Sequence, residues 1–223
     1  MRRIYTSGLR PGAVFGAAVN GASDAELKRT RSILSSAHSP SHGGTSLTLK
    51  LALHGDPAWK LVVAPALQWS RILWQAVTDP TNALIDTVEL VRLWYAAEPL
   101  QATTWRSSTG PLQRVELSLR RIGWLVVSPF IWRDDLGREL HLAEHSPNML
   151  GLYLKEAVQR DIERKAAHKL GPLFHGRRAC LVLARQLGVR SLRKLDARGR
   201  FLVRAASCGA LWTADRAWEA GYA

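Results

Sequence analysis

The sequence of 223 residues is poor in cysteine and has no long apolar run. Its two cysteines are too few for a disulfide scaffold or a CxxC-type zinc site. The longest apolar run, Leu61 to Leu67, contains Pro65 and is far shorter than the roughly 20 residues that a membrane helix needs. These absences exclude a small disulfide-rich fold and a transmembrane span. We therefore expect no membrane association and an intracellular protein, nuclear or cytoplasmic.

Acidic residues are also scarce, with 18 Asp and Glu against 31 Lys and Arg, a net charge of +13. Hydrophobic residues make up 47% of the chain and charged residues 22%, close to the average of globular proteins, so one or two small folded domains are expected. Arginine outnumbers lysine 24 to 7. This cationic excess indicates a partner that carries phosphates, either nucleic acid or an anionic surface.

Helical signals cover most of the chain. Capping boxes at residues 23–26 and 86–89 each predict a helix start, and Gly110-Pro111 predicts another. Residues 46–54 form a short apolar run that fits either a helix or a strand.

Two apolar stripes mark longer helices. Asp56-Pro57 predicts an N-cap followed by proline at the first helical position, with a kink at Pro65. Ser146-Pro147 predicts the start of a helix that ends at Gly171-Pro172. The first stripe comprises Val62, Ala66, Trp69, Leu73 and Val77, and the second comprises Leu150, Leu154, Val158, Ile162, Ala166 and Leu170.

The pattern changes to that of strands at residues 124–142. Two apolar runs, 124–127 and 130–132, are followed by a turn at 134–137 and a returning strand. We predict a mainly α fold, an irregular helical bundle with one small β-hairpin at about 124–142. We also predict a helical body over 1–170 and a basic helical subdomain over 171–223.

The predicted turn carries Asp134 and Asp135 two residues after Trp132. An aromatic-x-Asp-Asp turn is how reverse transcriptases hold two metal-binding carboxylates, and two-metal phosphoryl transfer needs such a pair. A third aspartate on a neighbouring strand is also needed, and the acids upstream lie at predicted caps or turns. We interpret the pair as an acidic hairpin turn. A metal-dependent phosphoryl-transfer enzyme using both aspartates is an alternative.

The other candidate sites favour structural roles. His141 and His145 have metal-ligand spacing for a helix, but His141 falls in the predicted strand, so we expect no metal. No glycine-rich phosphate loop follows a strand, so we expect no cofactor. Nine tryptophans leave open a tryptophan-rich helical scaffold or interaction protein. Core packing is the default for Trp59, Trp69, Trp74 and Trp94, and stacking on bases is an option for Trp105 and Trp212.

The C-terminal third has the strongest signal, with nine basic residues against one acid between 177 and 204. We predict helices at 179–187, 196–211 and 213–220. The middle one carries Arg200 and Arg204 on one face and apolar residues on another. A solvated basic face without a partner, anionic lipid and an acidic protein are alternatives to DNA or RNA backbone. The predicted nucleic-acid-binding residues are Arg177, Arg178, Arg185, Arg190, Arg193, Lys194, Arg198, Arg200 and Arg204.

Several stretches are similar to one family. Residues 10–17, RPGAVFGA, resemble the segment just after the palm in LINE-type (non-LTR) retrotransposon polyproteins. Residues 23–27, SDAEL, follow it as the first thumb helix does there. Residues 211–222, LWTADRAWEAGY, resemble the approach to the zinc-binding segment after the polymerase. Shorter similar stretches are 45–48, 54–59, 104–106, 110–112 and 119–124.

The resemblance implies a thumb and connector piece between the polymerase core and the zinc-binding and RNase H region of an RNA-directed DNA polymerase polyprotein. No residue here corresponds to the catalytic aspartates of the palm or to the downstream zinc ligands. We therefore expect a noncatalytic fragment that grips phosphate backbone without base specificity.

Overall fold

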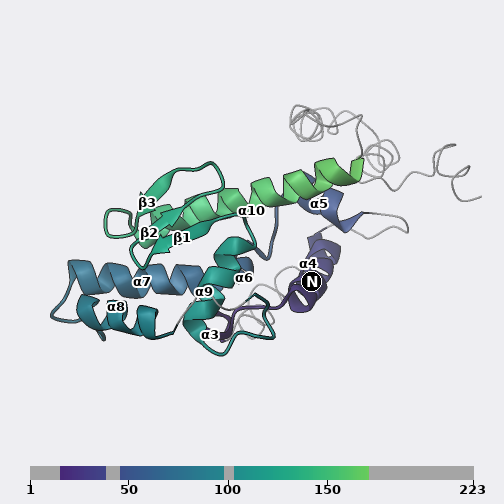
Figure 1. Ribbon diagram of the computed structural model, residues 1–223. Helices are drawn as coiled ribbons and strands as arrows, with labels where there is room; N and C mark the ends of the chain where they lie inside the picture. Colours follow the sequence, from purple (N-terminus) through teal and green to yellow (C-terminus); the bar gives the residue numbers. More distant parts are fainter. Residues whose placement is uncertain (1–15, 39–45, 98–102, 171–223) are drawn as a thin grey trace, which may run out of the picture. The chain divides into compact units, whose positions relative to one another are not determined.

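The computed structural model describes residues 16–38, 46–97 and 103–170, which contain eight helices and three strands (Figure 1). The chain divides into two compact units. The first takes the described residues of Met1–Thr30 and Ala58–Asp161, and the second takes those of Arg31–Pro57 and Ile162–Ala223. The helices expected at 179–187, 196–211 and 213–220, and the subdomain over 171–223, lie outside the described residues.

The first unit begins with α3 (Ala17–Asn20) and the start of α4 (Asp24–His38). The capping box predicted for α4 is confirmed. The Glu26 carboxylate accepts hydrogen bonds from the Ser23 amide at 2.8 Å and from the Ser23 hydroxyl at 2.7 Å, and Ser23 Oγ accepts one from the Glu26 amide at 3.3 Å. These bonds lower the pKa of Glu26.

In the second unit, residues 46–54 adopt the helical alternative as α5 (Leu47–His54). The prediction that Asp56 caps the next helix is wrong. Asp56 is buried and accepts hydrogen bonds from Arg31 Nε at 2.8 Å and Nη2 at 2.6 Å. A buried carboxylate needs a cationic partner, and Arg31 is 25 residues away in the chain.

The expected kink at Pro65 is a helix break. α6 (Trp59–Val62) ends before Val63, and α7 (Ala64–Thr78) starts afresh with Pro65 in its first turn. Proline fits a first turn because the amide it lacks would have no helical partner there. Four of the five predicted stripe residues are at most 5% exposed, whereas Val77 is 38% exposed.

Helices α8 (Thr87–Ala96) and α9 (Pro111–Arg120) both pack on α7. Asp86 caps α8 as predicted, accepting from the Glu89 amide at 2.7 Å. Helix α8 lies alongside α7 (Figure 1). The Trp94 ring lies 4.9 Å from that of Trp69 and holds α8 on α7. Proline in the first turn of α9 follows Gly110, also as predicted.

A three-stranded antiparallel sheet follows, formed by β1 (Leu125–Ser128), β2 (Ile131–Arg133) and β3 (Glu139–His141) in that order. The mainly α fold with a small hairpin region is confirmed, and the region contains two successive hairpins. One face of the sheet carries Val126, Trp132 and Leu140 in register, and Trp132 is fully buried.

The long helix α10 (Pro147–Leu170) starts at the predicted Ser146-Pro147. Its described stripe residues, Leu150, Leu154, Val158, Ile162 and Ala166, are each at most 3% exposed. The predicted stop at Gly171-Pro172 lies outside the described residues. Among the helices described, none has the length and apolar character that crossing a membrane requires.

Candidate functional site

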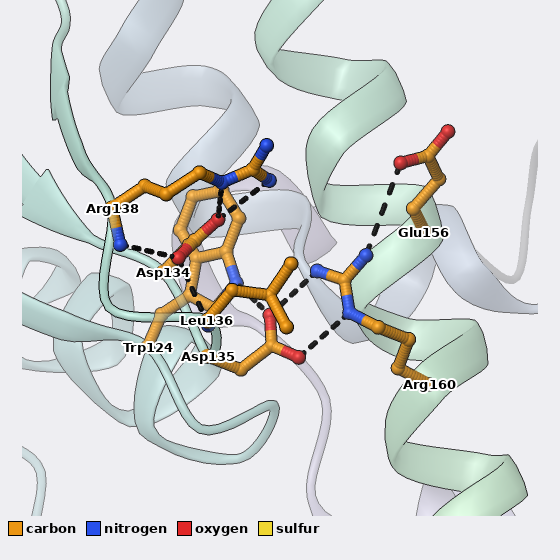
Figure 2. Close-up of polar contacts among 7 residues, drawn as sticks. All are labelled: Trp124, Asp134, Asp135, Leu136, Arg138, Glu156 and Arg160. Carbon is orange, nitrogen blue, oxygen red and sulfur yellow. Dashed lines mark hydrogen bonds and ion pairs between the residues drawn. The ribbon is translucent and has the colours of Figure 1, made fainter.

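The acidic turn between β2 and β3 is organised by Asp134. Its carboxylate accepts hydrogen bonds from the amides of Leu136 at 2.9 Å and Arg138 at 2.8 Å, and from Arg138 Nε at 2.7 Å (Figure 2). Gly137 completes the turn at a φ of 84°. The Asp134 side chain is fully buried, so these donors replace its hydration. The side chain therefore shapes the turn.

Asp135 anchors the same turn to α10. Arg160 donates to its two carboxylate oxygens at 2.7 and 2.6 Å, and Trp124 Nε1 donates to one of them at 3.1 Å (Figure 2). Glu156, one helical turn before Arg160, lies 3.9 Å from the same guanidinium. The Asp135 and Arg160 side chains are only 4% and 16% exposed. Burial raises the pKa of Asp135, but the hydrogen bond and charge of Arg160 and the bond from Trp124 outweigh it, so the pKa is lowered.

These contacts bear on the phosphoryl-transfer alternative. A metal pair would need the lone pairs of both carboxylates, and N–H donors already engage the oxygens of Asp134 and Asp135. In the ranges that the structure describes, no three His, Cys, Asp or Glu side chains are grouped so that they could hold a metal ion. The pair is better explained as a structural clamp between the sheet and α10. Sequence reasoning missed Arg160, because nothing local to it indicates a partner 25 residues away.

The two histidines also have structural surroundings. His141 lies in a strand, as predicted, at the end of β3, and its side chain is exposed. His145 Nδ1 lies 2.9 Å from the His141 carbonyl oxygen, and its ring meets Tyr153 edge-on at 6.0 Å. The two histidines do not lie on one helix. Their four-residue spacing therefore does not place them on one helical face, as a zinc-binding pair would require.

Trp105 is a candidate for base stacking in the sequence, but its ring packs against other residues of the same chain. The Arg121 guanidinium lies over the ring at 4.7 Å, and a Cβ added to Gly21 would come within 2.7 Å of it. Arg121 also donates to the Ala22 carbonyl at 2.9 Å and pairs with Asp24 at 3.0 Å. Trp105 therefore joins the N-terminal segment to α9. Trp212 lies outside the described residues.

Glu116 of α9 is a buried acid, although its i,i+4 spacing from Arg120 in the sequence predicts an ion pair on the outer face of the helix. The predicted pair with Arg120 is present, but Glu116 is only 5% exposed, so the outer placement is wrong. Its Oε2 is buried with no hydrogen-bond partner in the described part of the chain. Burial raises the pKa of Glu116, and Arg120 only partly offsets this.

We predict that Glu116→Gln stabilises the protein at pH 7 by on the order of 1 kcal/mol, because a buried charged oxygen without a partner costs more than a neutral amide. A carboxyl with a raised folded pKa favours folding most when protonated, and this contribution is lost as pH rises through that pKa. The advantage of the variant should therefore shrink as pH falls below the folded pKa of Glu116. Urea unfolding at several pH values measures the difference in free energy of unfolding between Glu116→Gln and the wild type. A difference that grows in acid would contradict a raised pKa of Glu116.

Charge is divided unevenly along the chain. The described residues hold 18 basic and 14 acidic side chains, whereas the remaining residues hold 13 basic and 4 acidic ones. At least eight of the twelve described arginines hold an acidic side chain, an amide oxygen or a carbonyl oxygen of the same chain. They are Arg31, Arg92, Arg114, Arg120, Arg121, Arg133, Arg138 and Arg160.

The nine predicted nucleic-acid-binding residues, from Arg177 to Arg204, all lie outside the described residues, so the structure does not place them.

Comparison with known proteins adds no relative: no family model matches the chain, and no curated protein or solved structure matches it significantly.

Proposed function

We propose that this protein binds the phosphate backbone of DNA or RNA, without reading base sequence, through the basic segment 177–204. Nine basic residues against one acid in that segment carry the proposal. A cationic segment of this density attracts polyanions by releasing condensed counterions, whatever the base sequence.

The contacts of the described arginines support assigning phosphate binding to the segment 177–204. Most of their arginines neutralise carboxylates or hold backbone and amide oxygens, as Arg160 does with Asp135 and Arg31 does with Asp56. Such arginines would have to break internal contacts to reach a phosphate. The proposal therefore rests on the C-terminal third, where basic residues outnumber acidic ones most strongly in the sequence.

The proposed origin is a thumb and connector piece of a LINE-type retrotransposon polymerase polyprotein, and its proposed role is noncatalytic. It rests on the similar stretches at 10–17, 23–27 and 211–222. Sequencing the flanking genomic DNA tests it, because a palm domain upstream and a CxxC cluster downstream are expected.

We predict that affinity for a mixed-sequence duplex falls by roughly two to three decades between 50 and 200 mM salt, if four to six cations engage phosphates. Replacing Arg200 and Arg204 by Ala should weaken binding similarly for all sequences. It should also reduce the log–log salt slope by about 1.8. Fluorescence anisotropy over a salt series measures both quantities.

The matched control is the double variant Arg71→Ala, Arg106→Ala, which removes the same charge from two exposed positions of the first unit. It should keep the wild-type slope. If both double variants flatten the slope equally, net charge and not the basic segment governs binding. Undetectable wild-type binding at 50 mM salt would leave the segment as a solvated basic face.

A further inference from the structure

The end of the short helix α3 carries a chemically labile pair, Asn20-Gly21. The chain has three asparagines, and only Asn20 is followed by glycine. Because glycine has no side chain, its nitrogen is the least hindered backbone nucleophile that can follow an asparagine. Asn20 is exposed, and its Oδ1 accepts a hydrogen bond at 2.6 Å from Arg114 Nη1, 94 residues away. A labile sequence and a long-range contact therefore meet at the same side chain.

We propose that Asn20 is a site of spontaneous deamidation that the folded protein keeps closed and that local opening of α3 exposes. In this reaction the Gly21 nitrogen loses its proton to solvent base and attacks Cγ of Asn20. The bond from Cγ to Nδ2 breaks, and ammonia leaves with a proton taken from water. Water then adds to one carbonyl of the cyclic imide, and the ring opens to aspartate or isoaspartate. The net reaction consumes one water and releases one ammonia.

Both reacting groups are engaged in the folded chain. The nucleophile, the Gly21 nitrogen, donates to the Ala17 carbonyl at 2.9 Å, at the end of α3. Ring closure needs this bond to break and Asn20 to leave its helical ψ. The electrophile is also held, because Arg114 fixes Oδ1 of Asn20. A Cβ added to Gly16 would lie 3.4 Å from Nδ2, so the side-chain amide is turned back toward the start of α3.

Arg114 is the positioning residue that keeps the site closed. Helix α3 has only four residues, a length at which a helix is unstable by itself, so contacts with the rest of the first unit must hold it. Arg114 of α9 also donates from Nε to Ser108 Oγ at 3.3 Å, which fixes its guanidinium on a second side. Local opening of α3 needs far less free energy than unfolding of the whole unit. The contact with Arg114 therefore sets how often the pair can react.

The two products differ in their effect on the fold. Aspartate at position 20 keeps the backbone and gives Arg114 a charged partner. Isoaspartate adds a carbon to the main chain immediately before Gly21. Gly21 has little room to shift, because a Cβ there would lie 2.7 Å from the Trp105 ring. Limited proteolysis should therefore cut the isoaspartate product near α3 faster than the Asn20→Asp variant, and equal rates would contradict this difference.

The test is the rate of deamidation at Asn20 in the full chain, incubated in mildly alkaline buffer and followed by peptide mass spectrometry. The folded wild type should react at least about 10-fold more slowly than the same chain in concentrated urea. Arg114→Met should accelerate the reaction of the folded chain by about 10- to 100-fold, because a hydrogen bond from a charged group is lost. In urea the wild type and Arg114→Met should react equally fast.

Arg160→Met is the matched control for global unfolding, because it breaks a buried ion pair with Asp135 away from α3. It should accelerate deamidation less than Arg114→Met does. The exposed Asn82 and Asn148, which no glycine follows, should stay intact in the same samples.

A variant that does not fold is recognised by circular dichroism. In that case Arg114→Lys, which lacks the fork of donors, replaces Arg114→Met with the same expectation. Asn20 that stays intact in urea overturns the proposal, and so does a folded wild type that reacts as fast as the unfolded chain. A folded Arg114 variant that reacts no faster than the wild type, or no faster than Arg160→Met, overturns it as well.

Discussion

Replacing Arg160 by methionine should lower the free energy of unfolding by about 3–5 kcal/mol. Arg160 donates to both carboxylate oxygens of Asp135, and the two side chains are 16% and 4% exposed. Methionine keeps much of the apolar stem but leaves the buried Asp135 carboxylate without the charge and the two hydrogen bonds of Arg160. Urea unfolding followed by tryptophan fluorescence and circular dichroism measures the loss.

Arg133→Met is the matched control, because Arg133 pairs with Glu139 at 2.7 Å but both side chains are nearly half exposed. Such a pair contributes about 0.2–1 kcal/mol at most. Adding Asp135→Leu to Arg160→Met should recover much of the loss, since removing both charges leaves none unpaired. If Arg160→Met costs no more than Arg133→Met, the contact with Asp135 is not a clamp.

The effect of Arg160→Met should also depend on pH. The pKa of Asp135 is lowered in the folded protein, so its ionised form contributes stability above the ordinary carboxyl pKa of about 3.9. That contribution is lost as pH falls through the folded pKa. The difference between the wild type and Arg160→Met should therefore be complete at pH 7 and should close in acid. A difference that is independent of pH would assign the loss to packing.

Local chemistry accounts for the parts of the fold that the sequence predicts well. The starts of α4 and α8 depend on hydrogen bonds within three residues, from Ser23 to Glu26 and from Asp86 to Glu89. A proline in the first turn likewise requires no knowledge of the rest of the chain. The stripe of α10 is predictable because its spacing depends only on the pitch of a helix.

The errors concern side chains whose surroundings come from distant parts of the sequence. Asp56 has the sequence context of a helix cap, but its bond with Arg31 spans 25 residues. Glu116 has the spacing of a surface ion pair, yet it is buried in α9, a helix that packs on α3, α7 and β1. The periodicity of apolar residues predicts which side of a helix is buried. It does not predict how much of the other sides neighbouring elements bury. The acidic turn at Asp134 and Asp135 is recognisable from adjacent residues. Its clamp, Arg160, is not, because it lies 25 residues from Asp135.

Gly21→Ala should be as damaging as the loss of Arg160, at about 3–5 kcal/mol, through strain and overpacking together. Gly21 has a φ of 62°, a conformation that L-residues rarely adopt. A Cβ there would also lie 2.7 Å from two carbons of the Trp105 ring and 3.3 Å from Pro65. The ring has little freedom to yield, because the Arg121 guanidinium lies over it at 4.7 Å.

Gly137→Ala separates the two causes. Gly137 has a φ of 84° but nothing within 4 Å of an added Cβ, so it should lose only the strain term, about 1–3 kcal/mol. The excess loss in Gly21→Ala then measures the collision with Trp105. Combining Gly21→Ala with Trp105→Leu should cost less than the sum of the two single changes, because the smaller side chain leaves room for the methyl group. If the two losses in free energy of unfolding are strictly additive, the effect of Gly21→Ala comes from backbone strain alone and not from a collision with Trp105.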